Sequence, residues 1–220
     1  MTTSDVNTSP LGSAPENSLR IESQLRESGL TAIAGVDEAG RGPCAGPLVL
    51  AAVIFVDINE PLLQGIRDSK ELSPARREEL YEIIITHASA YSIVEIPPHE
   101  LDELGLHKSN LEGMRRAVAA LSIQPDFILT DGYAIEGMSA PTLAVWKGDQ
   151  VSLSIGAASI LAKVYRDRIM VKLDEQFPEY GFAQHKGYIT ARHTAALKHY
   201  GITPVHRRSF ANIKALISHP

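Results

Sequence analysis

Four acidic residues stand where apolar stretches of this 220-residue chain stop. They are Asp37, Glu38, Asp131 and Asp149. A buried charge with no opposite charge facing it is strongly disfavoured, so carboxylates gathered at strand ends call for a cation. Four oxygen donors without a cysteine suit a hard ion such as Mg²⁺ or Mn²⁺ better than zinc. Two such ions could clamp the attacking and leaving oxygens of a phosphodiester, so the pattern points to metal-dependent hydrolysis of that bond.

These carboxylates differ in how specific a signal each one gives. Asp131 precedes a glycine and Asp149 follows one, and such pairs are common in turns, so either alone is more often a turn residue. The pair Asp37 and Glu38 is stronger, because a buried apolar run precedes it. If the strands that lead to Asp37 and Asp131 are adjacent and parallel, their carboxyl ends bring the two side chains together.

A loop rich in glycine and proline follows the acidic pair, at residues 39–47. Such a composition lets backbone N–H groups approach a ligand closely. Successive side chains of a strand point to opposite faces, so Asp37 and Glu38 can serve one site only where the strand ends, and we expect it to end there. Arg41 lies between two glycines and is a candidate phosphate contact.

The elements that must position these residues are visible in the apolar patterning. Strands are expected at 32–37, 48–56, 90–96, 126–130 and 141–146. Helices are expected around Ile21 and Leu25, from Pro74 after an N-cap at Ser73, from His107 to Leu121, and from Ser152 to Phe177. Three consecutive strands suggest a meander, and the helix before the fourth suggests a crossover into parallel pairing. The predicted fold class is therefore α/β, a mixed sheet with helices on its faces.

Composition and length limit the class of protein to which this chain can belong. Apolar residues make up 44% and charged residues 21%, which is ordinary for a globular protein, and the length favours one domain. Residues 1–20 are mostly small and polar, so we expect a disordered tail followed by a single domain at 21–220. The longest apolar run, 48–56, is too short to cross a bilayer, and no secretory signal is visible. We expect a cytoplasmic protein without a membrane partner.

Charge is distributed unevenly along the chain. The net charge is −5, but residues 181–220 contain no Asp or Glu and carry six basic residues. These are Lys186, Arg192, Lys198, Arg207, Arg208 and Lys214. We therefore expect a helical appendage with a basic surface that contacts a nucleic-acid backbone.

Several motifs, in one order along the chain, resemble bacterial ribonuclease HII. They are Gly35 to Gly42, Asp68-Ser69-Lys70, Asp131-Gly132, Lys147-Gly148-Asp149, the run 157–164, Arg166-Asp167-Arg168, and His185-Lys186-Gly187-Tyr188. The match covers about residues 31–213. The stretch 104–110 and residues 1–20 depart from the family pattern, and neither contains one of the carboxylates.

The resemblance implies a ribonuclease H-like fold with a five-stranded mixed sheet. It implies an endoribonuclease that hydrolyses the RNA strand of RNA/DNA hybrids and cuts 5′ to a single ribonucleotide embedded in duplex DNA. Two-metal-ion catalysis with Mg²⁺ or Mn²⁺ would leave 5′-phosphate and 3′-hydroxyl ends. A monomer is expected.

The resemblance also assigns roles to residues. It implies that Asp37, Glu38, Asp131 and Asp149 bind the metal ions. The backbone of Gly40, Arg41 and Gly42 would read the ribose 2′-hydroxyl, the group that separates RNA from DNA. Tyr188 would stack on the sugar at the RNA-to-DNA step. The lysines proposed as phosphate contacts are Lys70, Lys147 and Lys163.

Other interpretations remain open at this point. Asp167 could be the fourth ligand, but it lies inside an expected helix beside arginines, where ion pairing is the simpler explanation. His185, His193 and His206 could bind zinc, but their spacing matches no common site. A catalytically inert nucleic-acid-binding module of this fold is the rival from another class. Ribonuclease HIII is the rival among enzymes, although it usually carries an N-terminal domain that the polar residues before position 31 could not form.

Overall fold

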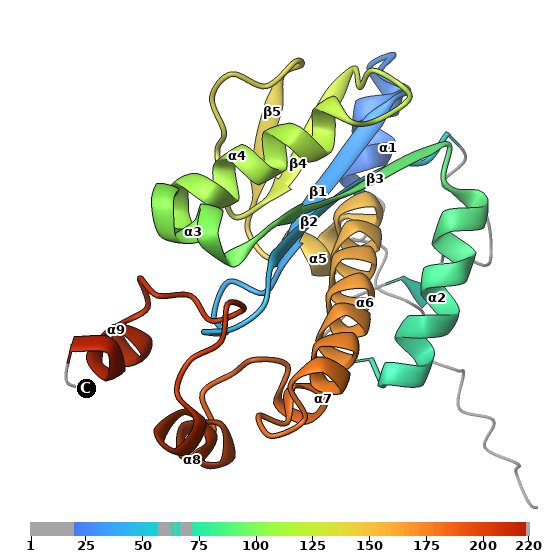
Figure 1. Cartoon of the computed structure of the whole chain (residues 1–220). Helices are drawn as coiled ribbons and strands as arrows, with labels where there is room; N and C mark the ends of the chain where they lie inside the picture. The colour runs from blue at the N-terminus through green and yellow to red at the C-terminus, as the bar shows by residue number, and fades with distance from the viewer. Residues whose placement is uncertain (1–19, 57–62, 64, 67–71, 219–220) are drawn as a thin grey trace, which may run out of the picture.

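The computed structural model describes residues 20–56, 63, 65–66 and 72–218 (Figure 1). Residues 1–19 of the expected tail and the candidate Lys70 lie outside the described residues, and residue 20 begins a helix. The described part contains a five-stranded sheet in the order β3-β2-β1-β4-β5, which confirms the predicted fold class. The strands are β1 (Ile33–Ala39), β2 (Leu48–Ile54), β3 (Ala90–Ile96), β4 (Phe127–Asp131) and β5 (Thr142–Val145).

Strand pairing follows the predicted meander and crossover. β1 and β2 pair antiparallel, as do β2 and β3, while β1 and β4 pair parallel, as do β4 and β5. β2 is buried along its whole length, because its sequence is entirely apolar and helices cover both faces of the sheet. Because β1 and β4 are parallel, their carboxyl ends lie side by side. The position of the candidate active site depends on this pairing.

Each face of the sheet is covered by one group of helices (Figure 1). On one face lie α2 (Pro74–His87) and the long α6 (Leu153–Gln176), which begins after a side-chain cap from Ser152. On the other lie α3 (Pro98–Leu104) and α4 (Leu106–Ala119). α2, α4 and α6 confirm predicted helices.

Two short helices before α6, namely α3 and α5 (Gly148–Val151), were not predicted, whereas α1 (Arg20–Glu27) was. Pro98 is the first residue of α3, where its missing N–H costs nothing. α5 is a single turn after β5, too short to show a period. α1 agrees with the helix expected around Ile21 and Leu25, which pack against β1 and β4. The described part holds no helix of the length and hydropathy needed to cross a membrane.

The C-terminal segment packs under the end of α6 and against the β1–β2 loop (Figure 1). It contains α7 (Phe182–His185), α8 (Ala191–Tyr200) and α9 (Ala211–Ser218). Apolar side chains of this segment form a cluster with Cys44 and Met170. One expectation here is wrong: Arg207 does not belong to a basic surface, because it is fully buried. The other five basic residues of the segment are exposed or half-buried.

Two histidines in this segment, His193 and His206, form a hydrogen-bonded pair of neutral rings. His193 Nδ1 donates to the carbonyl oxygen of Tyr188 (2.9 Å), so its Nε2 accepts from His206 Nε2 (3.0 Å). His206 Nδ1 in turn accepts from the backbone N–H of Thr203 (2.9 Å). His185 stacks on His193 with ring centroids 4.5 Å apart. Every ring nitrogen of His193 and His206 has a partner only while both rings are neutral.

Burial reinforces this preference for neutral histidine. Burial, together with the neighbouring His193, lowers the pKa of His206 to about 4. Burial also lowers the pKa of His193, with a further contribution from His185. An added proton on either ring would therefore face a donor in place of an acceptor in a dry surrounding. The histidines considered as zinc ligands thus serve as structural hydrogen-bonding groups.

We predict that the free energy of unfolding falls as pH drops from about 6.5 towards 4. In that window the unfolded chain binds a proton at His206 that the folded chain does not, which costs up to roughly 3 kcal/mol. Denaturant unfolding at a series of pH values would measure it. His206→Gln should lower stability at neutral pH and flatten the pH dependence, whereas His199→Gln at an exposed position should change neither. An equal slope in wild type and His206→Gln would contradict this account.

Candidate active site

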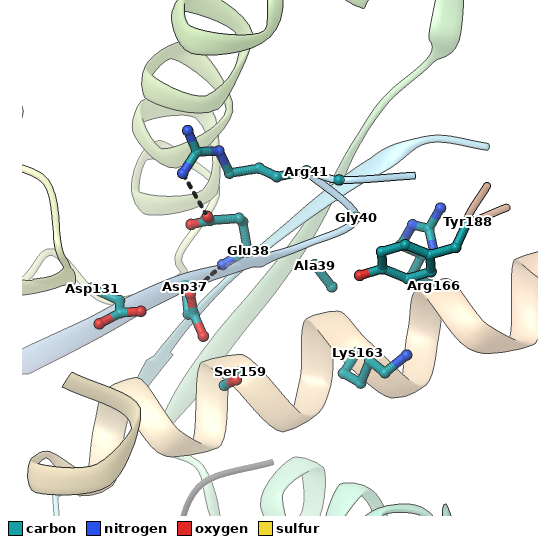
Figure 2. Close-up of a pocket in the computed structure, with 11 residues that line it drawn as sticks. Asp37, Glu38, Ala39, Gly40, Arg41, Asp131, Ser159, Lys163, Arg166 and Tyr188 are labelled. Carbon is teal, nitrogen blue, oxygen red and sulfur yellow. Dashed lines mark hydrogen bonds and ion pairs between the residues drawn. The ribbon is translucent and has the colours of Figure 1, made fainter. Parts of the chain in front are cut away.

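Asp37 and Glu38 leave β1 on opposite sides of the sheet (Figure 2). The expectation that the strand ends at this pair is wrong, because β1 continues to Ala39 and pairs with β2 along that length. The neighbouring strand ends instead. Parallel pairing of β1 with β4 stops at Val36 opposite Thr130, and β4 ends with Asp131. Both side chains therefore flank an open edge of β1, beside the carboxylate of Asp131.

The charged form of Asp37 is disfavoured in this arrangement. It is 5% exposed, and its pKa lies well above the usual value because of burial first and then the nearby carboxylates of Glu38 and Asp131. Hydrogen bonds from Ser159 and from the Glu38 N–H (2.7 Å) act in the opposite direction and are not sufficient. A site in which one carboxylate is buried beside two others has the electrostatic character of a cation site.

Asp131 and Asp149 are brought together by the turn after β5. Lys147 adopts a left-handed conformation (φ 52°, ψ 47°), which reverses the chain at the end of the strand. The Gly148 N–H then donates to Asp131 Oδ1 (2.7 Å), and Asp149 is buried in α5. Glycine is needed at 148 partly because Ile155 packs against it. The turn thus fixes Asp131 and introduces the fourth carboxylate.

Two adjoining pockets contain the four carboxylates. The first pocket holds Asp37 together with the Gly40–Gly42 loop and Tyr188. The second holds Asp149 together with Trp146 and Lys147. Glu38, Arg41 and Asp131 line both. The two pockets therefore form one continuous cleft whose middle is the carboxylate cluster.

The carboxylates are the kind of ligand that a divalent ion prefers, but their side chains do not converge on one point. Among the residues that the structure describes, no three His, Cys, Asp or Glu side chains converge closely enough to hold an ion as they stand. The donor set is nevertheless all oxygen, and a cation would offset the burial and the neighbouring carboxylates that raise the pKa of Asp37. Rotation of the side chains about their χ angles is needed to complete a coordination shell.

Arg41 lies over the carboxylate cluster and is already engaged by neighbouring side chains. Its Nη1 is 3.8 Å from Glu38 Oε1 and donates to the hydroxyl of Tyr133, whose ring centroid lies 5.0 Å from the guanidinium carbon. The side chain is 37% exposed, so one side of the guanidinium still faces the cleft. Tyr133 has no counterpart in the sequence-based site, since nothing in its local pattern marks it.

Two buried arginines hold the glycine loop in place. Arg166 of α6 donates from Nε to the Pro47 carbonyl (2.9 Å), from Nη2 to Ala45 (3.0 Å) and from Nη1 to Lys186 (3.0 Å). Arg207 donates from Nε to the Gly46 carbonyl (2.9 Å). It also donates from Nη1 to the carbonyl of Arg41 (3.2 Å). The loop carbonyls are therefore drawn inward, towards the two guanidinium groups.

Both arginines stay charged at neutral pH although burial disfavours the charge. Burial lowers the pKa of Arg166 to about 10. Burial and the nearby Arg166 lower the pKa of Arg207 to about 9. Sequence reasoning missed both. A signal for Arg166 was available, because it lies four residues after Ala162 and four before Met170, on the buried side of α6.

Gly40 is required by this packing. Its φ is +98°, which side chains rarely adopt, and a Cβ placed there would lie 2.1 Å from Arg166 Nε. The glycine therefore lets the buried arginine pass directly beneath the loop. Gly42 is exposed on the other side of Arg41, where a Cβ would meet the ring of Tyr188 at 3.3 Å.

Tyr188 stands at the mouth of the first pocket (Figure 2). Its side chain is 51% exposed, while its backbone is held by His193 and by a hydrogen bond from its N–H to the His185 carbonyl (2.9 Å). Gly187 before it has φ +83°, and a Cβ there would lie 2.4 Å from the Ala45 carbonyl oxygen. The tyrosine is thus fixed against the glycine loop with its ring free to meet a ligand.

Lys163, Lys147 and Asp167 occupy different positions relative to the cleft. Lys163 lines the first pocket and pairs with Asp167 (2.7 Å), one turn along α6. Asp167 lines neither pocket that contains the carboxylates, which favours the ion-pair interpretation of this residue. Lys147 is exposed in the second pocket. Lys163 and Lys147 therefore flank the carboxylates from opposite parts of the cleft.

Comparison with known proteins places this geometry in one family. A family model described as ribonuclease HII matches residues 34–213. The chain is 55% identical over 195 residues to a ribonuclease HII of Acidothermus cellulolyticus, which covers 89% of this chain and 64% of that protein. It is 53% identical over 195 residues to a ribonuclease HII of Saccharopolyspora erythraea, which covers 89% of this chain and 86% of that one.

A solved structure agrees with the sequence relatives. The crystal structure of ribonuclease H2 from Pyrococcus horikoshii OT3 superposes with a TM-score of 0.75 at 32% identity. The superposition covers 84% of this chain and 97% of that one. The likeness therefore extends through the sheet and its helices, well beyond the short motifs around the carboxylates.

We predict that Arg166→Lys destabilises the fold by roughly 2–4 kcal/mol, because an ammonium group cannot keep three buried carbonyl contacts in this geometry. Arg168→Lys is the matched control. That neighbour is half-buried and pairs with the exposed Glu78 and Glu82, so its replacement should cost less than about 1 kcal/mol. Urea unfolding of both variants measures the difference. Equal losses would mean that the buried hydrogen bonds of Arg166 do not anchor the loop.

Proposed function

The chain belongs to the ribonuclease HII family, and on that premise we propose that it is a metal-dependent endoribonuclease acting on RNA joined to DNA. Its substrates would be the RNA strand of RNA/DNA hybrids and single ribonucleotides embedded in duplex DNA, cut on their 5′ side. The observation that carries the proposal is the parallel pair β1 and β4. It sets Asp37 beside Asp131 in a cleft that also contains the glycine loop and Tyr188.

Catalysis would rest on Asp37, Glu38, Asp131 and Asp149, which would hold Mg²⁺ or Mn²⁺. Such ions supply a water nucleophile at neutral pH and stabilise charge on the scissile phosphate. The chain's own contribution is to fix the donors: the Gly148 N–H orients Asp131, and Ser159 and the Glu38 N–H orient Asp37. In-line attack at the phosphate 5′ to the ribonucleotide would leave 5′-phosphate and 3′-hydroxyl ends.

Recognition of RNA would come from the glycine loop. The backbone of Gly40, Arg41 and Gly42 lines the same pocket as Asp37, so a ribose seated there places its 2′-hydroxyl against that backbone. The carbonyl of Arg41 is taken by Arg207, which leaves the N–H groups on the cleft side as the more available partners. Tyr188 would then stack on the next sugar, at the RNA-to-DNA step, where a deoxyribose fits against the ring.

Two features favour an enzyme of this type over the alternatives considered. A catalytically inert binding module would gain nothing from burying Asp37 among other carboxylates at a cost in stability. The match to ribonuclease HII over residues 34–213 favours that family over ribonuclease HIII.

We further propose a cytoplasmic monomer with one catalytic domain at 21–220. The C-terminal segment is tied to the β1–β2 loop by the bridge between Ala45 and His206, which supports the single domain.

We predict that Asp37→Asn and Asp149→Asn each lower kcat at least about a hundredfold, because each removes a charge-stabilising group from the site. Asp167→Asn is the matched control and should change kcat only a few-fold, since its partner is Lys163. The assay is cleavage of a labelled DNA duplex with one ribonucleotide, with and without Mg²⁺ or Mn²⁺. Full activity in Asp37→Asn, or loss in Asp167→Asn alone, would overturn the assignment.

A second prediction concerns Tyr188. Tyr188→Ala should reduce cleavage at a single embedded ribonucleotide about tenfold or more, because it removes the ring that positions the junction sugar. Tyr188→Phe should keep most of the activity, since the hydroxyl is not needed for stacking. A whole-hybrid substrate measured in parallel should be affected less. If Tyr188→Ala cuts the single-ribonucleotide duplex as fast as wild type, the ring does not read the junction.

A further inference from the structure

Trp146 is the most exposed large apolar side chain of the described residues, at 81% of its surface. It is also the sole tryptophan of the chain. Single exposed apolar residues are common on protein surfaces and carry no meaning alone. The position of this one distinguishes it, because Trp146 lines the second pocket together with Glu38, Asp131 and Asp149.

The turn that carries Trp146 is tied to the carboxylates by its backbone. Val145 before it accepts from the Gly132 N–H (2.9 Å), and Gly148 after it donates to Asp131 Oδ1 (2.7 Å). Between them, Lys147 takes a left-handed conformation. The base of the indole is therefore fixed relative to Asp131, although the ring itself is exposed.

Trp146 and Tyr188 occupy different ends of the cleft. Tyr188 lines the pocket with the glycine loop, Trp146 lines the one towards the β5 edge of the sheet, and the two pockets meet at Glu38, Arg41 and Asp131. A strand whose phosphate lies on the carboxylates must leave the cleft in both directions. One direction leads past Tyr188 and the other past Trp146.

We propose that Trp146 is a substrate-positioning residue that packs its ring against a sugar of the cleaved strand on the 5′ side of the scissile phosphate. This rests on the proposed function, in which Tyr188 meets the strand on the 3′ side of the ribonucleotide. Bases inside a duplex are stacked on one another, so a ring outside the duplex meets sugar faces exposed in the minor groove. Exposed Lys147 beside the ring is placed to meet the adjoining phosphate.

Intrinsic fluorescence gives a direct test, because every photon from tryptophan reports on Trp146. The wild-type protein is titrated with a DNA duplex holding one ribonucleotide, with divalent ions chelated so that the strand stays intact. Anisotropy of a dye on the duplex measures binding independently. Binding should shield Trp146 from quenching by acrylamide, with the same midpoint as the anisotropy change. Unchanged quenching at saturating duplex would overturn the proposal.

Kinetics with Mg²⁺ or Mn²⁺ separate positioning from folding. Trp146→Ala should raise KM about fivefold or more with kcat within about twofold, and Trp146→Phe should restore most of the wild-type KM. Leu143→Ala is the matched control, an exposed apolar side chain on β5 that lines neither pocket, and it should leave both constants unchanged. A wild-type KM in Trp146→Ala would overturn the proposal.

Shortened substrates locate the contact on the strand. Removing the nucleotides 5′ of the cut also removes the leaving group, so this test measures binding, by dye anisotropy with divalent ions chelated. On that duplex the dissociation constants of wild type and Trp146→Ala should become equal, whereas shortening the 3′ side should leave them different. The opposite result would place the ring on the wrong side of the cut and overturn the proposal. Absence of metal-dependent cleavage by wild type would instead refute the proposed function itself, and this inference with it. Cleavage that does not depend on Trp146 refutes the inference alone.

Discussion

The burial of two guanidinium groups beneath the β1–β2 loop is the constraint on which the rest of the site depends. Arg166 and Arg207 come from segments far apart in the chain, yet both direct their N–H groups to carbonyls of the same loop. Arg207 Nη2 is the one guanidinium nitrogen of this pair that is buried without a partner among the described residues. A charged group out of water is costly unless its donors find acceptors, so the loop cannot move away from these hydrogen bonds without a loss of stability. Helix α6, the C-terminal segment and the glycine loop are therefore locked as one unit, and Gly40 exists in its present conformation because Arg166 passes beneath it.

Acidic side chains gather a few residues away from these buried arginines. Asp37, Glu38 and Asp131 crowd together at the open edge of β1, and Asp37 holds its proton more strongly than an ordinary carboxyl because of that crowding and its burial. The protein could have placed the buried arginines against these carboxylates and cancelled both charges. Instead the buried arginines donate to backbone carbonyls, and the carboxylates gather in the cleft, where Arg41 Nη1 lies 3.8 Å from Glu38 Oε1. That separation is the electrostatic reason to expect a cation and a phosphate in the cleft.

The histidine network links the C-terminal segment to the backbone of Tyr188. His193 holds the Tyr188 carbonyl, His206 holds His193, and Thr203 holds His206, so the position of the tyrosine depends on a chain of neutral donors and acceptors. Asp102 of α3 strengthens the same segment from the other face of the sheet, by accepting from the N–H groups of Arg208 (2.9 Å) and Ser209 (2.8 Å). The segment that looked like a basic appendage is thus a support for the loop, and its remaining exposed lysines and arginines surround that support.

The sequence by itself determined the strands and the long helices, and it marked the candidate carboxylates. Alternation and period give β1 to β5 and the long helices, and carboxylates after apolar strands mark Asp37 and Asp131, because these signals are local. Only the tertiary structure decided where long-range charges are satisfied. Arg207 looks like a surface residue in a basic stretch, and Tyr133 and Trp146 look like any aromatic near a turn, since a local pattern does not contain the carbonyl, carboxylate or pocket that each one meets. The edge of β1 beside Asp37 is open because β4 ends there, while β1 itself continues. The sequence of one strand does not show where its neighbour in the sheet ends.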